Sequence, residues 1–186
     1  MKVKPLRVLI DANVLYSQYL RDLLLILGER TIYHPFWTDD IIGEWKRNLL
    51  KNRPDLAEQK INRTIRLMNA AFTNSTINQY EDLIPLLSLP DDGDRHVLAA
   101  AVKGEMDAIL TFNVKDFPRS TMDAFAIQRF TPNEFFMYLY NQYQSLMEAF
   151  DYQLNSLRKP AMTRDGLMES LSRVGLNNAK YLFGQL

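Results

Sequence analysis

Residues 89–118 contain the pattern that most restricts the fold: an acidic turn, a short helix, an apolar strand and a polar strand end. The acidic turn, with sequence DDGD, precedes good helix formers at 96–102. The apolar run 107–112 is too short for an ordinary helix and leads into Asn113 and Asp116, which predicts a buried strand with a polar carboxyl end. This unit therefore places carboxylates at both ends of a helix and strand pair.

A second apolar run, residues 7–10, ends in the same way, at Asp11 and Asn13. In open α/β sheets, ligands bind beyond the carboxyl ends of the strands, so two such strand ends are expected to meet in one crevice. A third carboxylate, Glu44, lies on a helix that is predicted to begin near Thr38 and to turn Glu44 inward. The sequence thus predicts an acidic site built from three separate segments.

Short strands alternate with helices up to about residue 130, which predicts an α/β fold with a mostly parallel sheet of four or five strands covered on both faces. From Thr131, with Pro132 at the first helical position, the pattern becomes wholly helical. We therefore expect one α/β domain over residues 1–132 and a C-terminal helical extension over 133–186. The expected strands are 7–10, 31–37, 107–112 and 125–130. The expected helices are 15–28, one from Thr38 to before Pro54, 55–72, 96–102, 131–154, 163–174 and 177–183. Residues 74–90 form either a loop or a short helical turn, and a break is expected at 158–162.

Four phrases occur in order across roughly residues 5 to 135: VLIDANVL, IIGEW, LPDDGDRHVLAAA and ILTFNVKDF. In residue type, order and spacing they resemble the PIN domain nucleases, and most of all the bacterial toxins of the VapC type. The resemblance implies a three-layer α/β/α sandwich and a metal-dependent endoribonuclease that hydrolyses RNA phosphodiester bonds. It also implies a small antitoxin protein as partner and favours a homodimer.

Hydrolysis of a phosphodiester needs a nucleophile made from water and neutralisation of charge on the phosphate oxygens, and Mg²⁺ or Mn²⁺ supplies both. These hard ions prefer oxygen ligands, chiefly carboxylates. Many PIN domains carry a further acid where this chain has Asn113, so Asp116 is expected to replace it. The resemblance implies as metal ligands and catalytic residues Asp11, Glu44, Asp94 and Asp116, and as supporting hydrogen-bonding residues Asn13, Thr111 and Asn113.

Each of these carboxylates also has a purely structural interpretation as a helix cap, a turn residue or an exposed surface group. The order and spacing of the four acids favour a site over four separate coincidences. Three neighbouring residues are predicted to be structural or supporting groups rather than ligands: Asp91, Asp92 and His96.

The charge of the chain is balanced overall but uneven along the sequence. The net charge is zero, so a generally basic surface is not the argument for nucleic acid. Basic residues nevertheless gather between positions 45 and 67, which is consistent with phosphate binding or with a solvated helix face. The candidate RNA-binding residues in this segment are Lys46, Arg47, Lys51 and Arg53.

The composition excludes several other classes of protein. The absence of cysteine removes disulfides, thiolate metal sites and thiol catalysis. No run of about 18 apolar residues is present to span a membrane, and the first residues lead into a strand without a signal-peptide pattern. We therefore expect a cytoplasmic protein that does not enter a membrane.

Two other functions compete with the nuclease. A binding module that grips RNA or protein without cutting is supported by Asn113 and by the zero net charge, but such a module has no need for clustered acids that repel phosphate. A phosphatase or phosphotransferase with an aspartate nucleophile also places Asp at a strand end. It ranks last because Asn13 stands where a second Asp is expected.

Overall fold

A four-stranded, wholly parallel sheet forms the centre of the protein in the computed structural model, which describes residues 4–143, 145–158 and 161–184. The strand order is β2-β1-β3-β4, and apolar runs supply the buried inner strands. This confirms the predicted α/β class. The strands are β1 (Arg7–Ile10), β2 (His34–Phe36), β3 (Ala108–Leu110) and β4 (Gln128–Phe130).

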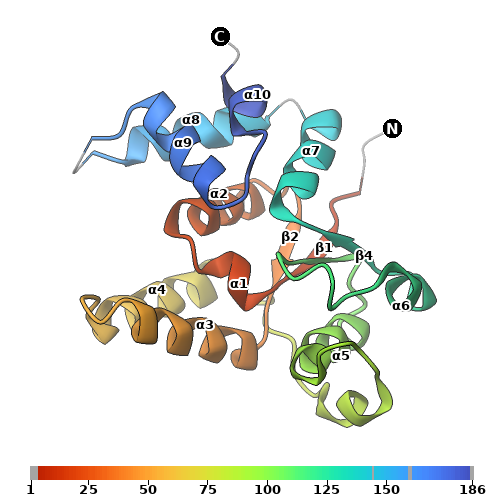
Figure 1. Cartoon of the computed structure of the whole chain (residues 1–186). Helices are drawn as coiled ribbons and strands as arrows, with labels where there is room; N and C mark the ends of the chain where they lie inside the picture. Colours follow the sequence, from red (N-terminus) through yellow and green to blue (C-terminus); the bar gives the residue numbers. More distant parts are fainter. Residues whose placement is uncertain (1–3, 144, 159–160, 185–186) are drawn as a thin grey trace.

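Helices cover both faces of the sheet and make the predicted three-layer sandwich (Figure 1). Helix α5 (Arg95–Lys103) packs against β1 and β3 on one face. On the other face, α2 (Gln18–Glu29) contacts β2, and α7 (Pro132–Gln142) contacts β4. The remaining helices are α1 (Ala12–Leu15), α3 (Asp39–Asn52), α4 (Glu58–Ala71), α6 (Arg119–Ala124), α8 (Leu146–Ser156), α9 (Arg164–Arg173) and α10 (Ala179–Phe183), with short 3₁₀ segments η1 (Glu81–Leu86) and η2 (Asp92–Asp94).

Two helices that the sequence predicted as continuous are interrupted. The predicted helix 15–28 is divided between α1 and α2 because Ser17 has an extended backbone and its hydroxyl caps α2. The predicted helix 131–154 is divided between α7 and α8, with Tyr143 extended between them. Neither break contains Gly or Pro, so the sequence has no helix-breaking residue at either place and the apolar periodicity continues across both breaks.

Strand β1 has the predicted bounds, whereas β2, β3 and β4 are shorter than predicted. The expected strand 125–130 begins only at Gln128, since Phe125 ends α6 and Ala126 has a positive φ of 54°. Helix α6 itself was not predicted. The segment 74–90, left open by the sequence, contains η1, and the break expected at 158–162 includes residues 159 and 160, which lie outside the described residues.

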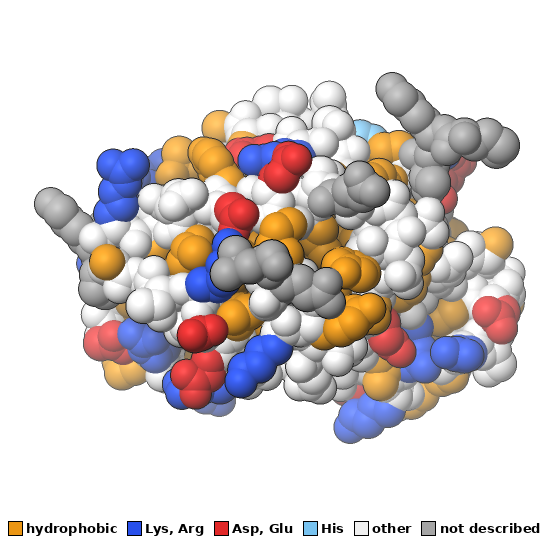
Figure 2. Space-filling view, turned by 90° about the horizontal axis from the view of Figure 1, so that it is seen from above, with side chains coloured by type: hydrophobic (Ala, Val, Ile, Leu, Met, Phe, Trp, Pro, Cys, Tyr) orange, Lys and Arg blue, Asp and Glu red, His pale blue; other side chains and the backbone are white. Residues whose placement is uncertain are grey.

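The C-terminal helices form a further layer outside α2. Helices α8 and α9 both contact α2, and within the layer Phe150 stacks on Phe183 with 4.4 Å between ring centroids. The Arg164 guanidinium ties the layer together by donating to the Phe183 carbonyl at 2.9 Å and to Asp151. Seen from above, this side of the molecule shows apolar side chains between acidic and basic ones (Figure 2). Within the described part of the chain, no helix combines the length and apolar character needed to cross a membrane.

Thr38 fixes the start of α3 as the sequence predicted. Its buried hydroxyl accepts a hydrogen bond from the Ile41 amide at 3.1 Å, and Asp39 and Asp40 occupy the first turn. Replacing Thr38 by Ala is expected to lower the free energy of unfolding by about 1 to 2 kcal/mol. Urea unfolding followed by circular dichroism measures this, with Thr38→Ser as the variant that keeps the cap. Equal stability of Thr38→Ala and the wild type would contradict the role of the cap.

Candidate active site

The carboxyl ends of β1 and β3 lie side by side, because the two strands are neighbours in the sheet. The backbone N–H of Asp11 donates to the Leu110 carbonyl at 3.0 Å, which brings Asp11 next to Thr111. Asp11 is only 3% exposed and caps α1 by accepting from the Ala12 amide at 2.7 Å. The predicted meeting of two polar strand ends is therefore present in the structure.

The Thr111 hydroxyl connects the two strand ends. It donates to Asp11 Oδ2 at 2.6 Å and accepts from the Asn113 backbone N–H at 2.9 Å. The Asn13 amide donates to the same Asp11 oxygen at 2.6 Å and to Thr111 Oγ1 at 3.2 Å. Burial raises the pKa of Asp11, and the Thr111 hydrogen bond and the Ala12 amide oppose that rise. Asn13 and Thr111 therefore hold the orientation of a buried carboxylate.

Asp94 is held against this network by Asn113. The Asn113 side-chain amide donates to Asp94 Oδ2 at 3.1 Å. Burial, followed by repulsion from Asp11, raises the pKa of Asp94 to about 6, and Asn113 partly opposes the rise. Asp91 and Asp116 add smaller repulsions. The sequence pattern did not indicate that Asn113 would reach Asp94.

Three carboxylates come close enough together to share one cation. Asp91, Asp94 and Asp116 each offer an oxygen atom, and these atoms lie within 4.8 Å of one another. Asp116 is buried, Asp94 is half-buried and Asp91 is exposed. The structure thus brings together two of the predicted ligands and adds Asp91.

Asp91 takes part in a turn, as the sequence predicted, and also lies in the group of close carboxylates. Asp91 does form a turn, since its Oδ1 accepts from the Gly93 amide at 2.8 Å. It also lies three residues before Asp94 at the start of the 3₁₀ segment η2, where side chains three apart fall on the same side. That spacing is the signal that could have identified Asp91. Asp92 lies outside the three-carboxylate group and pairs with Arg95 at 3.3 Å.

Glu44 lies at the side of the site, on α3. Its Oε2 is 3.8 Å from His96 Nε2, and its Oε1 accepts from Asn48 at 3.4 Å. Among the described residues, neither Glu44 nor Asp11 belongs to the group of three close carboxylates. The charge of Asp11 nevertheless adds to the rise in the pKa of Asp94, and the charge of Glu44 adds to the rise in the pKa of Asp11. His96 Nδ1 is buried and has no hydrogen-bond partner within the described part of the chain.

The four basic residues predicted to contact RNA lie on α3 and at its end. Two of them are engaged elsewhere: Lys46 pairs with Glu58 at 2.7 Å and Arg53 pairs with Asp55 at 2.7 Å. Arg47 and Lys51 are exposed. The structure therefore leaves these last two as the better candidates for phosphate contacts.

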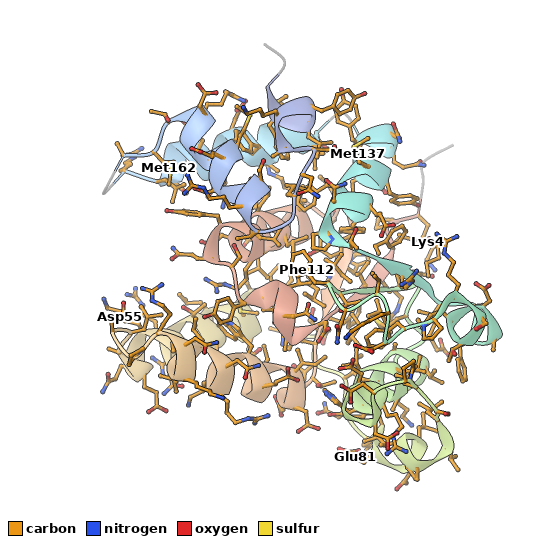
Figure 3. All side chains as sticks on the ribbon, viewed as in Figure 1. Lys4, Asp55, Glu81, Phe112, Met137 and Met162 are labelled. Atoms are coloured by element: carbon orange, nitrogen blue, oxygen red, sulfur yellow. The ribbon has the colours of Figure 1, made fainter. Side chains whose placement is uncertain are left out.

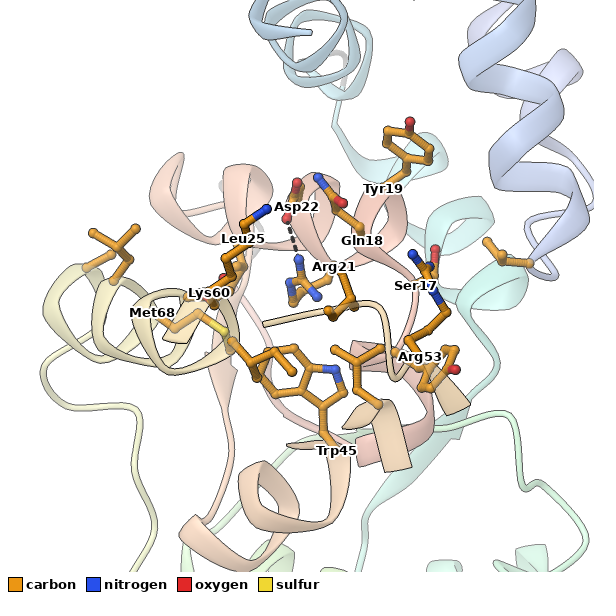
Figure 4. Close-up of a pocket in the computed structure, with 18 of the residues that line it drawn as sticks. Ser17, Gln18, Tyr19, Arg21, Asp22, Leu25, Trp45, Arg53, Lys60 and Met68 are labelled. Atoms are coloured by element: carbon orange, nitrogen blue, oxygen red, sulfur yellow. Dashed lines mark hydrogen bonds and ion pairs between the residues drawn. The ribbon is translucent and has the colours of Figure 1, made fainter. Parts of the chain in front are cut away.

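A cavity lies away from the acidic site, between α2, α3 and α4, and none of the four predicted catalytic acids lines it (Figure 4). It has a volume of about 780 Å³. The Arg21 guanidinium lies 5.1 Å above the ring of Trp45 in its wall and pairs with Asp22 at 3.2 Å. Aromatic and apolar side chains line this cavity together with charged ones of both signs, among them Arg21, Asp22 and Lys60, so its lining differs from the carboxylate cluster.

The donor set of the acidic site fits a hard divalent cation. All three close groups are carboxylates, which are the ligands that Mg²⁺ and Mn²⁺ prefer. Burial is the main cause of the raised pKa of Asp94, and the negative charges of Asp11, Asp91 and Asp116 add to the rise, so a bound cation would offset repulsion at this site. No cysteine is present to favour a softer metal.

The sequence of this chain is similar to those of known proteins. The sequence matches the PIN domain family over residues 7–115. It is 30% identical over 93 residues to a protein named putative ribonuclease VapC50 from Mycobacterium tuberculosis (strain ATCC 25618 / H37Rv), a match that covers 50% of this chain and 54% of the relative. The chain thus spans about half the length of this curated relative. No solved structure gives a significant match. Because the family match covers more than half of the chain and includes β1 and β3 with the polar residues that follow them, the chain belongs to the PIN domain family.

Proposed function

We propose that this protein is a Mg²⁺- or Mn²⁺-dependent endoribonuclease that hydrolyses RNA phosphodiester bonds, and that it is the toxin of a toxin–antitoxin pair. The observation that carries the proposal is the carboxylate group Asp91, Asp94 and Asp116, placed beside the buried Asp11 at the carboxyl ends of two parallel strands. Family membership and the similarity to a putative ribonuclease support it. We assign the nuclease to residues 1–132 and treat 133–186 as its helical extension.

The residues of this chain have separate parts in the proposed reaction. A bound divalent cation neutralises charge on the phosphate and makes water a better nucleophile. Asp94, Asp116 and Asp91 hold that cation, and Asn113 orients Asp94 through its 3.1 Å hydrogen bond. The remaining groups complete the proposed site: Asp11 as a buried carboxylate, Asn13 and Thr111 as its hydrogen-bond donors, Glu44 as the acid on the α3 side, and Arg47 and Lys51 as contacts to RNA phosphates.

The direct test is cleavage of total cellular RNA by the purified protein, with Mn²⁺ or Mg²⁺ in one series and with a chelator in the other. Mapping every new 5′ end identifies the substrate in the same experiment. We expect cuts at discrete positions that require the cation. An absence of cuts under every metal condition, or cuts that persist in the chelator, would overturn the proposal.

The proposed partners are an RNA substrate and a small antitoxin protein. The clustered carboxylates form an acidic site that accepts a basic side chain from such an inhibitor. The antitoxin follows from the resemblance to VapC-type toxins. A homodimer and a cytoplasmic location stay predictions.

Cation binding is expected to stabilise the folded protein. A cation that binds only the folded state adds about 2.7 kcal/mol when its concentration is 100 times its dissociation constant. For a chain of this size, that is an increase in Tm of about 5 to 10 °C. Differential scanning fluorimetry at pH 7.5 with and without Mn²⁺ measures it. Asp91→Asn should reduce the increase, whereas Asp92→Asn, in the same turn but outside the carboxylate group, should retain it. An equal increase in both variants would contradict the ligand assignment.

The alternative is a PIN domain that binds RNA or protein with little or no catalysis. The observation that favours it is Asn113, an amide at the strand end that hydrogen-bonds Asp94 instead of adding a carboxylate. This alternative predicts the cation-dependent rise in Tm without any RNA cleavage.

A further inference from the structure

Phe112 is an exposed aromatic residue inside the network that builds the acidic site. It lies between Thr111 and Asn113 and is 36% exposed, although it follows a strand whose residues are fully buried. Figure 3 shows it near the centre of the molecule, between the elements that carry the site and the C-terminal helices. An apolar ring in this position has no evident role in cation binding.

The backbone on both sides of Phe112 is fixed by residues of the site. Its own N–H donates to Asn13 Oδ1 at 3.1 Å, and the N–H of Asn113 donates to the Thr111 hydroxyl at 2.9 Å. The side chain of Asn113 then holds Asp94. The position of the ring is therefore tied to the positions of Asp11 and Asp94.

One side of the ring is supported by the C-terminal extension. Gly175, between α9 and α10, has a φ of +96°, and a Cβ atom there would lie 2.6 Å from a carbon of the Phe112 ring. Only glycine fits this backbone conformation at such a close approach. The turn after α9 thus packs directly on the ring and restricts its movement, while the residue as a whole stays 36% exposed.

We infer that Phe112 is a stacking surface for an unpaired base of the RNA strand, next to the phosphate held at the acidic site; this rests on the proposed nuclease function. Unstacked bases commonly stack on aromatic side chains of a protein, and this stacking contributes to binding affinity for any base. Because the ring is already held in place, little conformational entropy is lost when the base binds. The substrate class is accordingly single-stranded or looped RNA, and the C-terminal helices contribute to its recognition by supporting the ring.

The test combines a protein variant with a change in the RNA. The substrate is a synthetic oligonucleotide that spans a mapped cut, with each base near the cut replaced in turn by an abasic residue. In the wild type, one abasic position is expected to raise KM by about 5- to 150-fold, which is the change in affinity expected from the loss of one stacked base. Phe112→Leu, which keeps an apolar side chain but loses the ring, should raise KM by a similar factor on the intact RNA. The same abasic position should then cause no further loss.

The matched control is Phe125→Leu. Phe125 is 38% exposed and lies beside Met106 and Ile127, at the opposite ends of the strands from the acidic site. This variant should keep the KM of the wild type and its full abasic effect. Wild-type KM in Phe112→Leu, or an abasic effect that persists undiminished in Phe112→Leu, would overturn the inference.

A binding measurement separates failure of this inference from failure of the proposed function. If the wild type cuts no RNA, the nuclease proposal fails, and stacking is then judged by a single-stranded RNA containing 2-aminopurine. Quenching of its fluorescence by the wild type but not by Phe112→Leu would support stacking. Equal quenching by both proteins, or none by either, would overturn it.

Discussion

Replacing Asp94 by Asn is expected to abolish most RNA cleavage while making the cation-free protein more stable at pH 7.5. Loss of a ligand removes several kcal/mol of transition-state charge stabilisation, which corresponds to a decrease in kcat/KM of about 10²- to 10⁴-fold. The amide keeps the size of the side chain and leaves one oxygen to accept from Asn113. The decrease is measured as initial rates on an oligonucleotide that spans a mapped cut.

The gain in stability follows from the sign of the shift in the Asp94 pKa. Burial and the neighbouring Asp11 raise this pKa from 3.8 to about 6, so the folded state holds the proton more tightly than the unfolded state. The contribution of Asp94 to stability is therefore complete below about pH 4 and is lost as pH rises through 6. Asp94→Asn removes that loss. Because Asp94 is partly exposed, we expect a gain of about 1 to 2 kcal/mol at pH 7.5 and little change near pH 4.

Urea unfolding in chelator at both pH values measures this gain. Asp92→Asn is the control, since this acid lies in the same turn, is exposed and, among the residues that the structure describes, belongs to no close carboxylate group. A less stable Asp94→Asn protein at pH 7.5 would contradict the charge repulsion. It would also leave misfolding as the reason for any lost cleavage.

The strand ends of the site were predictable from the sequence because parallel strands place their carboxyl ends on one edge of a sheet. Asp11 and Asn113 directly follow the apolar runs 7–10 and 107–112, Asn13 lies two residues after Asp11, and Thr111 lies near the end of the second run, so locating the runs located these residues. Capping signals were equally local. Thr131 forms the expected helix start, with Glu134 completing a capping box, because both groups lie within one turn.

Other parts of the site depend on contacts between distant segments. The hydrogen bond from Asn113 to Asp94 and the packing of Gly175 on Phe112 join residues far apart in the chain, and no local pattern specifies them. The direction of Glu44 is set by how α3 packs, and the result is proximity to His96 rather than membership of the close carboxylate group. The breaks at Ser17 and Tyr143 were missed because apolar periodicity reports which residues are buried and does not report where a helix is interrupted.

Thr111→Val is expected to cause the second large effect, in both stability and activity. Valine has nearly the same shape, but it removes the hydroxyl that donates to Asp11 and accepts from the Asn113 amide. A hydrogen bond to a charged group is worth about 1.5 to 3 kcal/mol. Since the position is fully buried, water cannot replace the lost partner, and we expect a decrease of about this size in the free energy of unfolding. Urea unfolding of the two proteins measures it.

Activity should fall because the Thr111 hydroxyl holds Asp11 and the Asn113 backbone in position. Thr111 orients the buried Asp11 beside the cation site, and removal of such an orienting group typically lowers activity by about 10- to 100-fold. The Thr111 hydrogen bond lowers the pKa of Asp11, so its loss should raise that pKa further and move the acidic limb of the pH profile of kcat/KM to higher pH. Thr111→Ser keeps the hydroxyl and should restore the profile. If Thr111→Val loses stability while its pH profile stays unchanged, the hydroxyl supports the fold alone, and the ionisation of Asp11 is then independent of Thr111.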